Sequence, residues 1–343
     1  MNDRLDGPAM NDLRVTQFSR RKSSSTFSIE RVFSDVRNAM PAHVIVRDVR
    51  NANFSKGAIP RLRDAWAARR HAGHVNHITG DVHYLSYFLP KRHTILTVHD
   101  TLFVERARGI KRLLLWFFWL WLPIRRCQLV TAISEESKRR VLQLVRTEPE
   151  RIKVIPDPVS PTFNPCEPNR LTGAFRLLHV GTKPNKNLER IISALEGLDI
   201  ELTIIGRLND VQRQLLVKHR VSHRPLANLD EERLHSEYCR SDALIFVSLD
   251  EGFGLPILEA QATGRPVITS GKPPMDEVAG DGALFVNPKN VAEIRAGVEQ
   301  LMHNAELRST LVTSGYKNVE KYKAESIAAA YASLYQSVWI QAQ

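Results

Sequence analysis

Two glutamates, Glu251 and Glu259, stand eight positions apart, with two glycines and Pro256 between them. An apolar run precedes this segment and helix-forming residues follow it, which predicts a strand, a glycine-rich turn and a helix. Proline suits the first helical turn, where its missing N–H has no partner to lose. Backbone N–H groups at such a helix start bind anions such as phosphate, and carboxylates accept hydrogen bonds from sugar hydroxyls. The segment therefore has the chemistry of a site for a nucleotide-linked sugar.

The simpler alternative is a strand–helix turn that carries two solvated glutamates, since glycine-rich turns occur in many α/β proteins. The longer pattern is more specific, because it continues through residues 262–270 and 275–288. This whole block resembles the retaining glycosyltransferases of family 4. The resemblance implies an α/β protein with the GT-B fold, in which two Rossmann-like domains have parallel sheets that face each other across a cleft.

The resemblance also implies roles for the residues of the block. Glu251 is expected to contact the donor sugar and to take part in catalysis, and Glu259 is expected to bind the ribose hydroxyls. The turn between them is expected to meet the sugar and phosphates through Gly252, Phe253, Gly254 and Leu255. In members of the family, the acceptor hydroxyl replaces the diphosphate on the same face of the donor sugar, and the leaving phosphate assists this substitution. We predict a UDP- or GDP-sugar as donor, no additional cofactor and no metal ligands.

A second segment with glycine and lysine follows an apolar run and opens a helical pattern. Gly181 permits a tight turn, and Lys183 and Lys186 bring positive charge to the place where a leaving diphosphate becomes more negative. The segment resembles the phosphate-contacting loop of the family, and Lys186 matches its lysine. Thr182 departs from the arginine that many members carry, and Lys183 and Arg207 are both candidates for the missing charge. Solvated loop lysines are the alternative.

The first half of the chain contains candidates for the acceptor side. His99 ends an expected strand, where the resemblance places a histidine beside the donor sugar and the acceptor. It is expected to bind a sugar hydroxyl or to transfer a proton, with Asp100 orienting it or capping the next segment; a structural histidine is the alternative. Arg21 and Lys22 follow the first strand, where this chain lacks the family's glycines. They are expected to bind an anionic acceptor, and a solvated basic loop is an equal alternative.

Apolar runs alternate with helical patterns along all 343 residues, which indicates parallel sheets and two domains. Four prolines in residues 154–165 predict an extended connector. Strands are expected at 13–18, 42–46, 75–78, 94–98, 127–133, 176–180, 201–205, 243–247 and 266–269. The expected organisation is a disordered N-terminus (1–9), an acceptor-side domain (10–160), a linker (161–172), a donor-binding domain (173–325) and a C-terminal helix (326–343) that packs on the first domain.

The net charge of +11 is placed very unevenly. Residues 1–150 contain 26 of the 48 Lys and Arg but 14 of the 37 Asp and Glu, and the remainder is close to neutral. A basic half implies an anionic partner, and without a nucleic-acid motif a membrane surface or a phosphorylated acceptor is favoured. No signal peptide is visible, which predicts a cytoplasmic protein, peripheral on the inner face of the cell membrane. Three scattered cysteines without a CxxC pair argue against a disulfide framework and against a zinc site.

Residues 113–124 form an apolar run of twelve residues between Lys111-Arg112 and Arg125-Arg126. The run is too short to cross a bilayer, which takes about 20 residues. Three tryptophans between cationic ends suit a helix that lies in the membrane interface. Burial against the sheet of the first domain is an equal alternative.

The expected function is the retaining transfer of a sugar from a nucleotide diphosphate sugar to a glycan or lipid-linked acceptor in cell-surface polysaccharide synthesis. Three alternatives stay open: a GT-B phosphorylase or epimerase, a non-catalytic membrane-docked subunit that binds nucleotide sugars, and a nucleic-acid-binding protein suggested by charge alone. Thr182 and the absent early glycines keep the second alternative open. Neither the sugar nor the base follows from the sequence.

Overall fold

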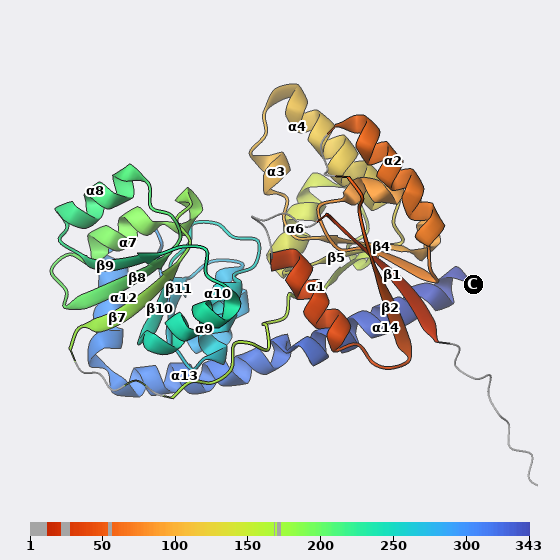
Figure 1. Cartoon of the computed structure of the whole chain (residues 1–343). Coiled ribbons are helices and arrows are strands. Elements are labelled where there is room, and N and C mark those ends of the chain that lie inside the picture. Colours follow the sequence, from red (N-terminus) through yellow and green to blue (C-terminus); the bar gives the residue numbers. More distant parts are fainter. Residues whose placement is uncertain (1–11, 22–27, 54–56, 168, 170–172) are drawn as a thin grey trace, which may run out of the picture. The chain divides into compact units, whose positions relative to one another are not determined.

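The computed structural model describes residues 12–21, 28–53, 57–167, 169 and 173–343. The predicted disordered N-terminus and Lys22 lie outside these residues. The chain divides into two compact units, one of Met1–Pro156 with Glu325–Gln343 and the other of Asp157–Ala324 (Figure 1). Each unit contains a six-stranded parallel sheet.

The sheet of the first unit has the strand order β2-β1-β3-β4-β5-β6. Its strands are β1 (Leu13–Ser19), β2 (Val44–Arg50), β3 (Val75–Ile78), β4 (Thr94–Val98), β5 (Leu129–Ala132) and β6 (Ile152–Val154). Every residue of β3 and β4 is buried, as expected for a parallel sheet that is covered on both faces. The order reverses between β1 and β3, so the chain segments that follow these two strands meet at one edge of the sheet.

The helices of the first unit include the last helix of the chain. They are α1 (Ser28–Asn38), α2 (Ala58–Ala68), α3 (Leu102–Glu105), α4 (Gly109–Leu115), a π-helical turn η4 (Trp116–Trp121), α5 (Leu122–Arg125), α6 (Glu135–Leu144) and α14 (Ala324–Ala342), with short 3₁₀ turns between them. Ser134 caps α6 by accepting a hydrogen bond of 3.0 Å from the N–H of Ser137, as serine commonly does at a helix start.

The helix α14 runs along the sheet of the first unit (Figure 1). A buried polar contact joins the two. The Tyr335 hydroxyl accepts a hydrogen bond of 3.1 Å from Gln17 and lies 2.7 Å from Nδ1 of His77. Burial lowers the pKa of His77 to about 3, so the ring is neutral at physiological pH. The contact ties the end of the chain to β1 and β3.

The sheet of the second unit has the order β12-β11-β10-β7-β8-β9. Its strands are β7 (Phe175–Val180), β8 (Ile200–Ile205), β9 (Ser222–Leu226), β10 (Ala243–Phe246), β11 (Val267–Ser270) and β12 (Ala283–Val286). The chain adds strands on one side of β7 and then continues with β10 on its other side. In open sheets of this kind, ligands bind at the carboxyl ends of the strands where the order reverses, which here lies between β7 and β10.

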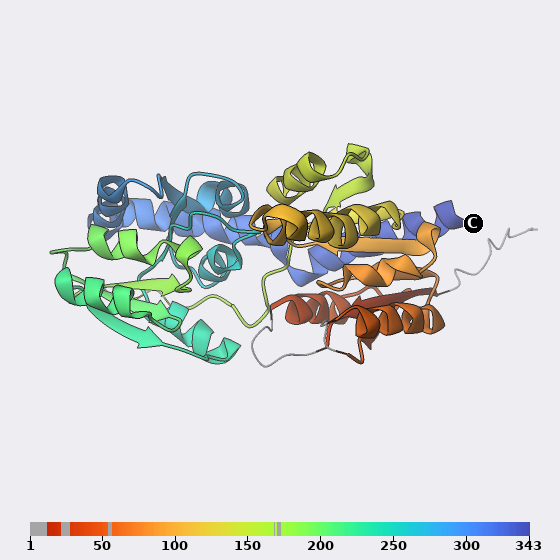
Figure 2. The same cartoon turned by 90° about the horizontal axis from the view of Figure 1, so that it is seen from above.

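Helices cover both faces of this second sheet (Figures 1 and 2). One face is covered by α7 (Leu188–Ala194), α8 (Asp210–Lys218) and α12 (Val291–His303). The other is covered by α9 (Glu231–Arg240), α10 (Leu255–Ala262), α11 (Met275–Ala279) and α13 (Ala305–Val319). The α/β class with two parallel sheets is therefore confirmed.

The apolar run 113–124 is partly buried and partly exposed. Leu120 and Ile124 are fully buried in the core of the first unit, whereas Leu113 and Phe118 are 58% and 42% exposed. Among the described residues, no helix is both long enough and apolar enough to cross a bilayer.

The expectation of no disulfide is wrong, because Cys166 and Cys239 are bonded to each other across 73 residues of sequence. Cys239 lies in α9, and Cys166 lies in the extended segment that runs past this helix. The spacing of the cysteines in the sequence does not indicate that Cys166 and Cys239 lie close together. Their closeness depends on how the segment after Pro156 crosses the second unit. The third cysteine, Cys127, is buried in the first unit, and burial raises the pKa of its thiol to about 12.

Candidate functional site

An ion pair lies where the strand order of the second unit reverses. Lys186 ends the loop that follows β7, and Glu251 lies in the loop that follows β10. Their Nζ and Oε1 atoms are 2.7 Å apart, and both side chains are mostly buried. Asn185 donates a second hydrogen bond, of 3.2 Å, to the same carboxylate oxygen. The two residues predicted from separate motifs are thus brought together at the position that the sheet topology favours for a ligand.

Two glycines give the loops of this edge their shape. Gly181 has φ +97°, and a Cβ atom there would lie 2.9 Å from Cγ and Cε of Lys186. Gly206 has φ +143°, and a Cβ atom there would lie 2.8 Å from Cγ2 of Thr182. Glycine therefore lets the lysine side chain pass across the first loop. Thr182 packs on the second loop and donates a hydrogen bond of 2.8 Å to the carbonyl oxygen of Arg207.

Lys183 and Arg207 are the two cations that the sequence offers in place of the missing arginine. Both side chains are exposed. Neither forms an ion pair within the described part of the chain. They follow β7 and β8, which are neighbours in the sheet. Their positive charge is accordingly not neutralised by a protein carboxylate.

The helix α10 begins directly after Gly254, whose φ is 120°. Among the described residues, the backbone N–H groups of Phe253, Gly254 and Leu255 have no hydrogen-bond acceptor. Pro256 occupies the first turn, as the sequence predicts. This helix start can therefore bind an anion through three N–H groups and the positive end of the helix dipole.

Glu259 lies one turn into α10 and is only 5% exposed. The hydroxyl of Tyr238, a fully buried residue of α9, donates a hydrogen bond of 2.8 Å to its Oε2 atom. This hydrogen bond fixes the position of the carboxylate. Sequence reasoning missed Tyr238, because nothing in the motif indicates a partner 21 residues earlier in another helix.

Asn187 is a second residue that sequence reasoning did not single out. It has a left-handed backbone with φ 62° and is 1% exposed. Its Nδ2 atom donates to the carbonyl oxygens of Val247 (3.1 Å) and Pro288 (2.7 Å). One side chain therefore joins the segments that follow β7, β10 and β12, and it does so next to Lys186. The available signal was an asparagine directly before a helix, a residue type that tolerates this backbone.

A pocket of about 520 Å³ opens at the carboxyl ends of β10, β11 and β12. The Lys272 side chain, which lines it, donates a hydrogen bond of 2.7 Å to the carbonyl oxygen of Leu249. The other lining residues are Leu249, Gly271, Phe285, Val286, Asn287, Pro288, Lys289 and Glu293. The pocket adjoins the loop that carries Glu251 and adds two lysines to this edge.

The first unit contains the residues predicted for the acceptor side. His99 follows β4 and is 8% exposed, and its Nε2 atom donates a hydrogen bond of 2.9 Å to the carbonyl oxygen of Thr79. In the neutral ring the lone pair is therefore on Nδ1. Asp100 accepts a hydrogen bond of 2.9 Å from the N–H of Leu102, the first residue of α3. Burial raises the pKa of Asp100.

Arg21 is exposed, and its Nη1 atom donates to the carbonyl oxygen of Ala52. The structure does not describe Lys22. The preceding residue, Arg20, forms ion pairs with Glu30 and Asp81. Part of the positive charge at the end of β1 is therefore neutralised inside the unit.

Two family models match the chain and cover both units. Residues 15–163 match the model described as Glycosyltransferase Family 4, and residues 169–318 match the model described as Glycosyl transferases group 1. The chain belongs to family 4 of the glycosyltransferases. The enzyme class and the GT-B fold predicted from the sequence are both confirmed.

Relatives of known name support the same class. The O-antigen chain mannosyltransferase B of Escherichia coli is 25% identical over 293 residues, which cover 77% of this chain and 74% of the relative. The O-antigen chain mannosyltransferase RfbU of Salmonella typhimurium is 27% identical over 220 residues, which cover 61% of each chain. Anabaena HepE, solved with UDP and glucose, superposes with a TM-score of 0.77 at 15% identity, over 95% of this chain and all of HepE. This last likeness concerns the fold.

Proposed function

We propose that the protein transfers a mannosyl residue from a nucleoside diphosphate sugar to a glycan acceptor in the synthesis of a cell-surface polysaccharide. The observation that carries the proposal is the Lys186–Glu251 pair at the strand-order reversal, beside the start of α10. The names of the two O-antigen relatives support mannose and a polysaccharide product. The complexes of HepE with UDP and with UDP-glucose support a nucleoside diphosphate sugar as the donor.

The diphosphate is the leaving group and gains negative charge as the glycosidic bond to it breaks. Preorganised cations and N–H groups stabilise such charge more in the transition state than in the ground state. Lys186 and the α10 start supply this stabilisation, and Lys183 and Arg207 add long-range charge. The leaving phosphate accepts the proton of the attacking hydroxyl on the same face, which gives retention of configuration.

The two carboxylates of the second unit recognise the sugar nucleotide through hydrogen bonds. Glu251 accepts from a hydroxyl of the donor sugar, and Glu259, which Tyr238 positions, accepts from the ribose. In the first unit, the Nδ1 side of His99 accepts from a sugar hydroxyl or takes up a proton, because Nε2 donates to Thr79. In this proposal the lysines stabilise the charge on the leaving diphosphate, and the glutamates orient the donor.

A donor panel tests the proposal. We expect GDP-mannose to raise the melting temperature more than UDP-glucose, UDP-galactose or UDP-N-acetylglucosamine, because a ligand that binds the native state stabilises it. The same donor is expected to release its nucleoside diphosphate in the presence of a lipid-linked glycan, and NMR of the product is expected to show the anomeric configuration of the donor. An inverted linkage would contradict the retaining mechanism. Binding without turnover would instead favour a non-catalytic subunit.

We further propose that the first unit docks on an anionic membrane at the inner face of the cell membrane. Exposed apolar side chains recur on one face of the helix that runs through α4 and η4: Ile110, Leu113, Leu114 and Phe118. Exposed cations accompany them: Arg106, Arg108, Lys111 and Arg112. An apolar stripe with flanking Lys and Arg is typical of a helix that lies in the interface of an anionic bilayer.

Replacing Ile110 and Leu113 by glutamate is expected to weaken binding to vesicles with anionic lipid by at least roughly tenfold, because each apolar side chain contributes about 1.5–3 kcal/mol when it leaves water. Vesicle flotation at two salt concentrations measures this effect. Val217→Glu is the matched control, since Val217 is 74% exposed on α8 of the second unit. Equal flotation of all three proteins would exclude this surface as the docking site.

A further inference from the structure

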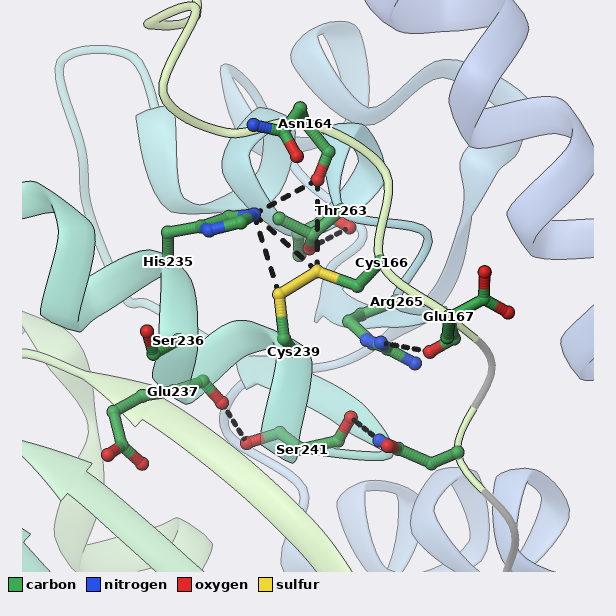
Figure 3. The surroundings of a disulfide bond; sticks show 12 residues. Asn164, Cys166, Glu167, His235, Ser236, Glu237, Cys239, Ser241, Thr263 and Arg265 are labelled. Atoms are coloured by element: carbon green, nitrogen blue, oxygen red, sulfur yellow. Dashed lines mark hydrogen bonds between the residues drawn. A yellow bond between two sulfur atoms is a disulfide. The ribbon is translucent and has the colours of Figure 1, made fainter.

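Cys166, Cys239 and His235 form a cluster on the second unit, away from the proposed donor loops in sequence (Figure 3). His235 and Cys239 are four positions apart in α9 and therefore share one face of this helix. Cys166 reaches the same place from the extended segment that crosses α9, and it is bonded to Cys239. The three residues thus bring two sulfurs and an imidazole nitrogen within 4.8 Å of one another.

The two nitrogen–sulfur distances in the cluster match those of a tetrahedral zinc centre. His235 Nε2 lies 3.4 Å from the sulfur of Cys239 and 3.5 Å from the sulfur of Cys166. Bonds of about 2.3 Å from zinc to sulfur and about 2.0–2.1 Å from zinc to nitrogen, at tetrahedral angles, place nitrogen and sulfur roughly 3.5 Å apart. The imidazole therefore already has the spacing from both sulfurs that a shared ion requires.

The carbonyl oxygen of Asn164 lies next to the cluster, on the side of His235 and Cys166 (Figure 3). The carbonyl oxygen of Asn164 is 3.1 Å from His235 Nε2 and 3.8 Å from the sulfur of Cys166. In the disulfide form Nε2–H donates to this oxygen. In a metal-bound form the proton of the neutral ring resides on Nδ1, and the Asn164 oxygen or a water molecule takes the fourth position.

The cluster is accessible to ions and reductants. All three side chains are partly exposed. Cys166 also borders a pocket of about 350 Å³. Cys127, by contrast, is fully buried with a raised thiol pKa, so it is protonated and unreactive.

We propose that reduction of the Cys166–Cys239 disulfide converts this cluster into a site for one Zn²⁺ ion, held by the two thiolates and His235. Reduction breaks the S–S bond and leaves two thiols. A dithiol supplies two electrons and two protons and becomes a disulfide itself, whereas a phosphine supplies two electrons and becomes a phosphine oxide, with the oxygen and the two protons coming from water. Zinc binding then releases these two thiol protons without a change in the oxidation state of the metal. Thiolate and imidazole ligands together favour zinc over magnesium or calcium.

Both forms fasten the segment around Cys166 to α9. The residue before Cys239 is Tyr238, which donates its hydrogen bond to Glu259. The ring of Phe163, on the same segment, packs edge-on against Tyr238 at 5.6 Å between centroids. The zinc site therefore maintains, under reducing conditions, the anchorage of α9 that the disulfide provides under oxidising ones. The inference depends on the cluster alone and stands apart from the proposed glycosyl transfer.

Cobalt titration of the full-length, phosphine-reduced protein under argon tests the proposal. Thiol titration in denaturant first verifies that all three cysteines are reduced. We expect one equivalent of Co²⁺ to give thiolate-to-cobalt charge transfer and the visible bands of a tetrahedral centre, and Zn²⁺ to abolish both. We also expect Zn²⁺ to raise the melting temperature of the reduced wild-type protein, a readout that needs no variant.

Cys166→Ser and Cys239→Ser are expected to lose the charge-transfer bands, and His235→Ala is expected to weaken cobalt binding by at least tenfold. Cys127→Ala is the matched control and is expected to retain one tetrahedral cobalt ion. A fully reduced wild-type protein without stoichiometric cobalt binding would overturn the proposal. A disulfide that resists the phosphine in the folded protein would overturn it as well, because the cluster would then be a permanent cross-link.

Discussion

Lys186→Ala lowers kcat/KM for glycosyl transfer by roughly 100- to 1,000-fold, the range found when one preorganised group at a developing negative charge is removed. The lysine is the cation fixed at the strand-order reversal, where its Nζ atom lies 2.7 Å from Glu251 and 4.5 Å from the centroid of the Phe246 ring. Both contacts hold the ammonium group in place before the reaction, so little reorganisation is needed when charge develops. Initial rates of nucleoside diphosphate release over a range of donor concentrations measure the loss.

The matched control for this variant is Lys218→Ala, which removes a lysine from the exposed last turn of α8 in the same unit. We expect its kcat/KM to stay within about twofold of the wild-type value, since surface substitutions away from a site have small effects. Equal losses in both variants would indicate a general effect of net charge. An unchanged rate for Lys186→Ala would remove the lysine from the proposed mechanism.

Asn187→Ala lowers the free energy of unfolding of the second unit by about 3 kcal/mol. Two buried carbonyl oxygens lose their donors, at about 1–3 kcal/mol in total for imperfectly replaced hydrogen bonds. Alanine in the left-handed region adds a cost of about 1–2 kcal/mol. Amide hydrogen exchange read by mass spectrometry measures the effect locally. Increased exchange is expected in peptides that cover β7, β10 and β12, the segments that this side chain joins.

Asn228→Ala separates the two contributions, because Asn228 also has a left-handed backbone, with φ 57°, but is exposed. We expect it to cost about 1 kcal/mol, the backbone contribution alone. Unfolding of the first unit is an internal reference for both variants. All five tryptophans lie in the sequence ranges of the first unit, so tryptophan fluorescence reports its unfolding. Equal destabilisation by the two alanine variants would show that the hydrogen bonds of Asn187 do not hold the loops together.

Local patterns in the sequence were sufficient to predict most strands of both sheets, because buried parallel strands are short apolar runs between helical segments. The strand β9, with the sequence Ser-His-Arg-Pro-Leu, escaped prediction since it is a polar edge strand with a proline. The strand β6 has only three residues and ends where the proline-containing region 154–165 begins. The disulfide escaped because it joins residues that only the fold brings together.

In the candidate site, too, some residues could be predicted from local sequence patterns and others could not. Glu251 and Lys186 were predictable because each lies in a contiguous motif, and the sheet order then explains why two motifs about 65 residues apart meet. Tyr238 and Asn187 were not predictable, since their roles consist of hydrogen bonds to residues that are remote in the sequence. Polar partners of this kind hold a site in shape but leave no spacing pattern.

Isothermal titration calorimetry with a nucleoside diphosphate and its sugar ester tests the central claim most directly, using the wild type, Lys186→Ala and Glu251→Gln. The account predicts that Lys186→Ala weakens both ligands, because both contain the diphosphate. It predicts that Glu251→Gln weakens the sugar ester roughly tenfold more than it changes the affinity for the free diphosphate, since one hydrogen bond to a charged group is worth about 1.5–3 kcal/mol. Equal affinities of all three proteins for both ligands would contradict it.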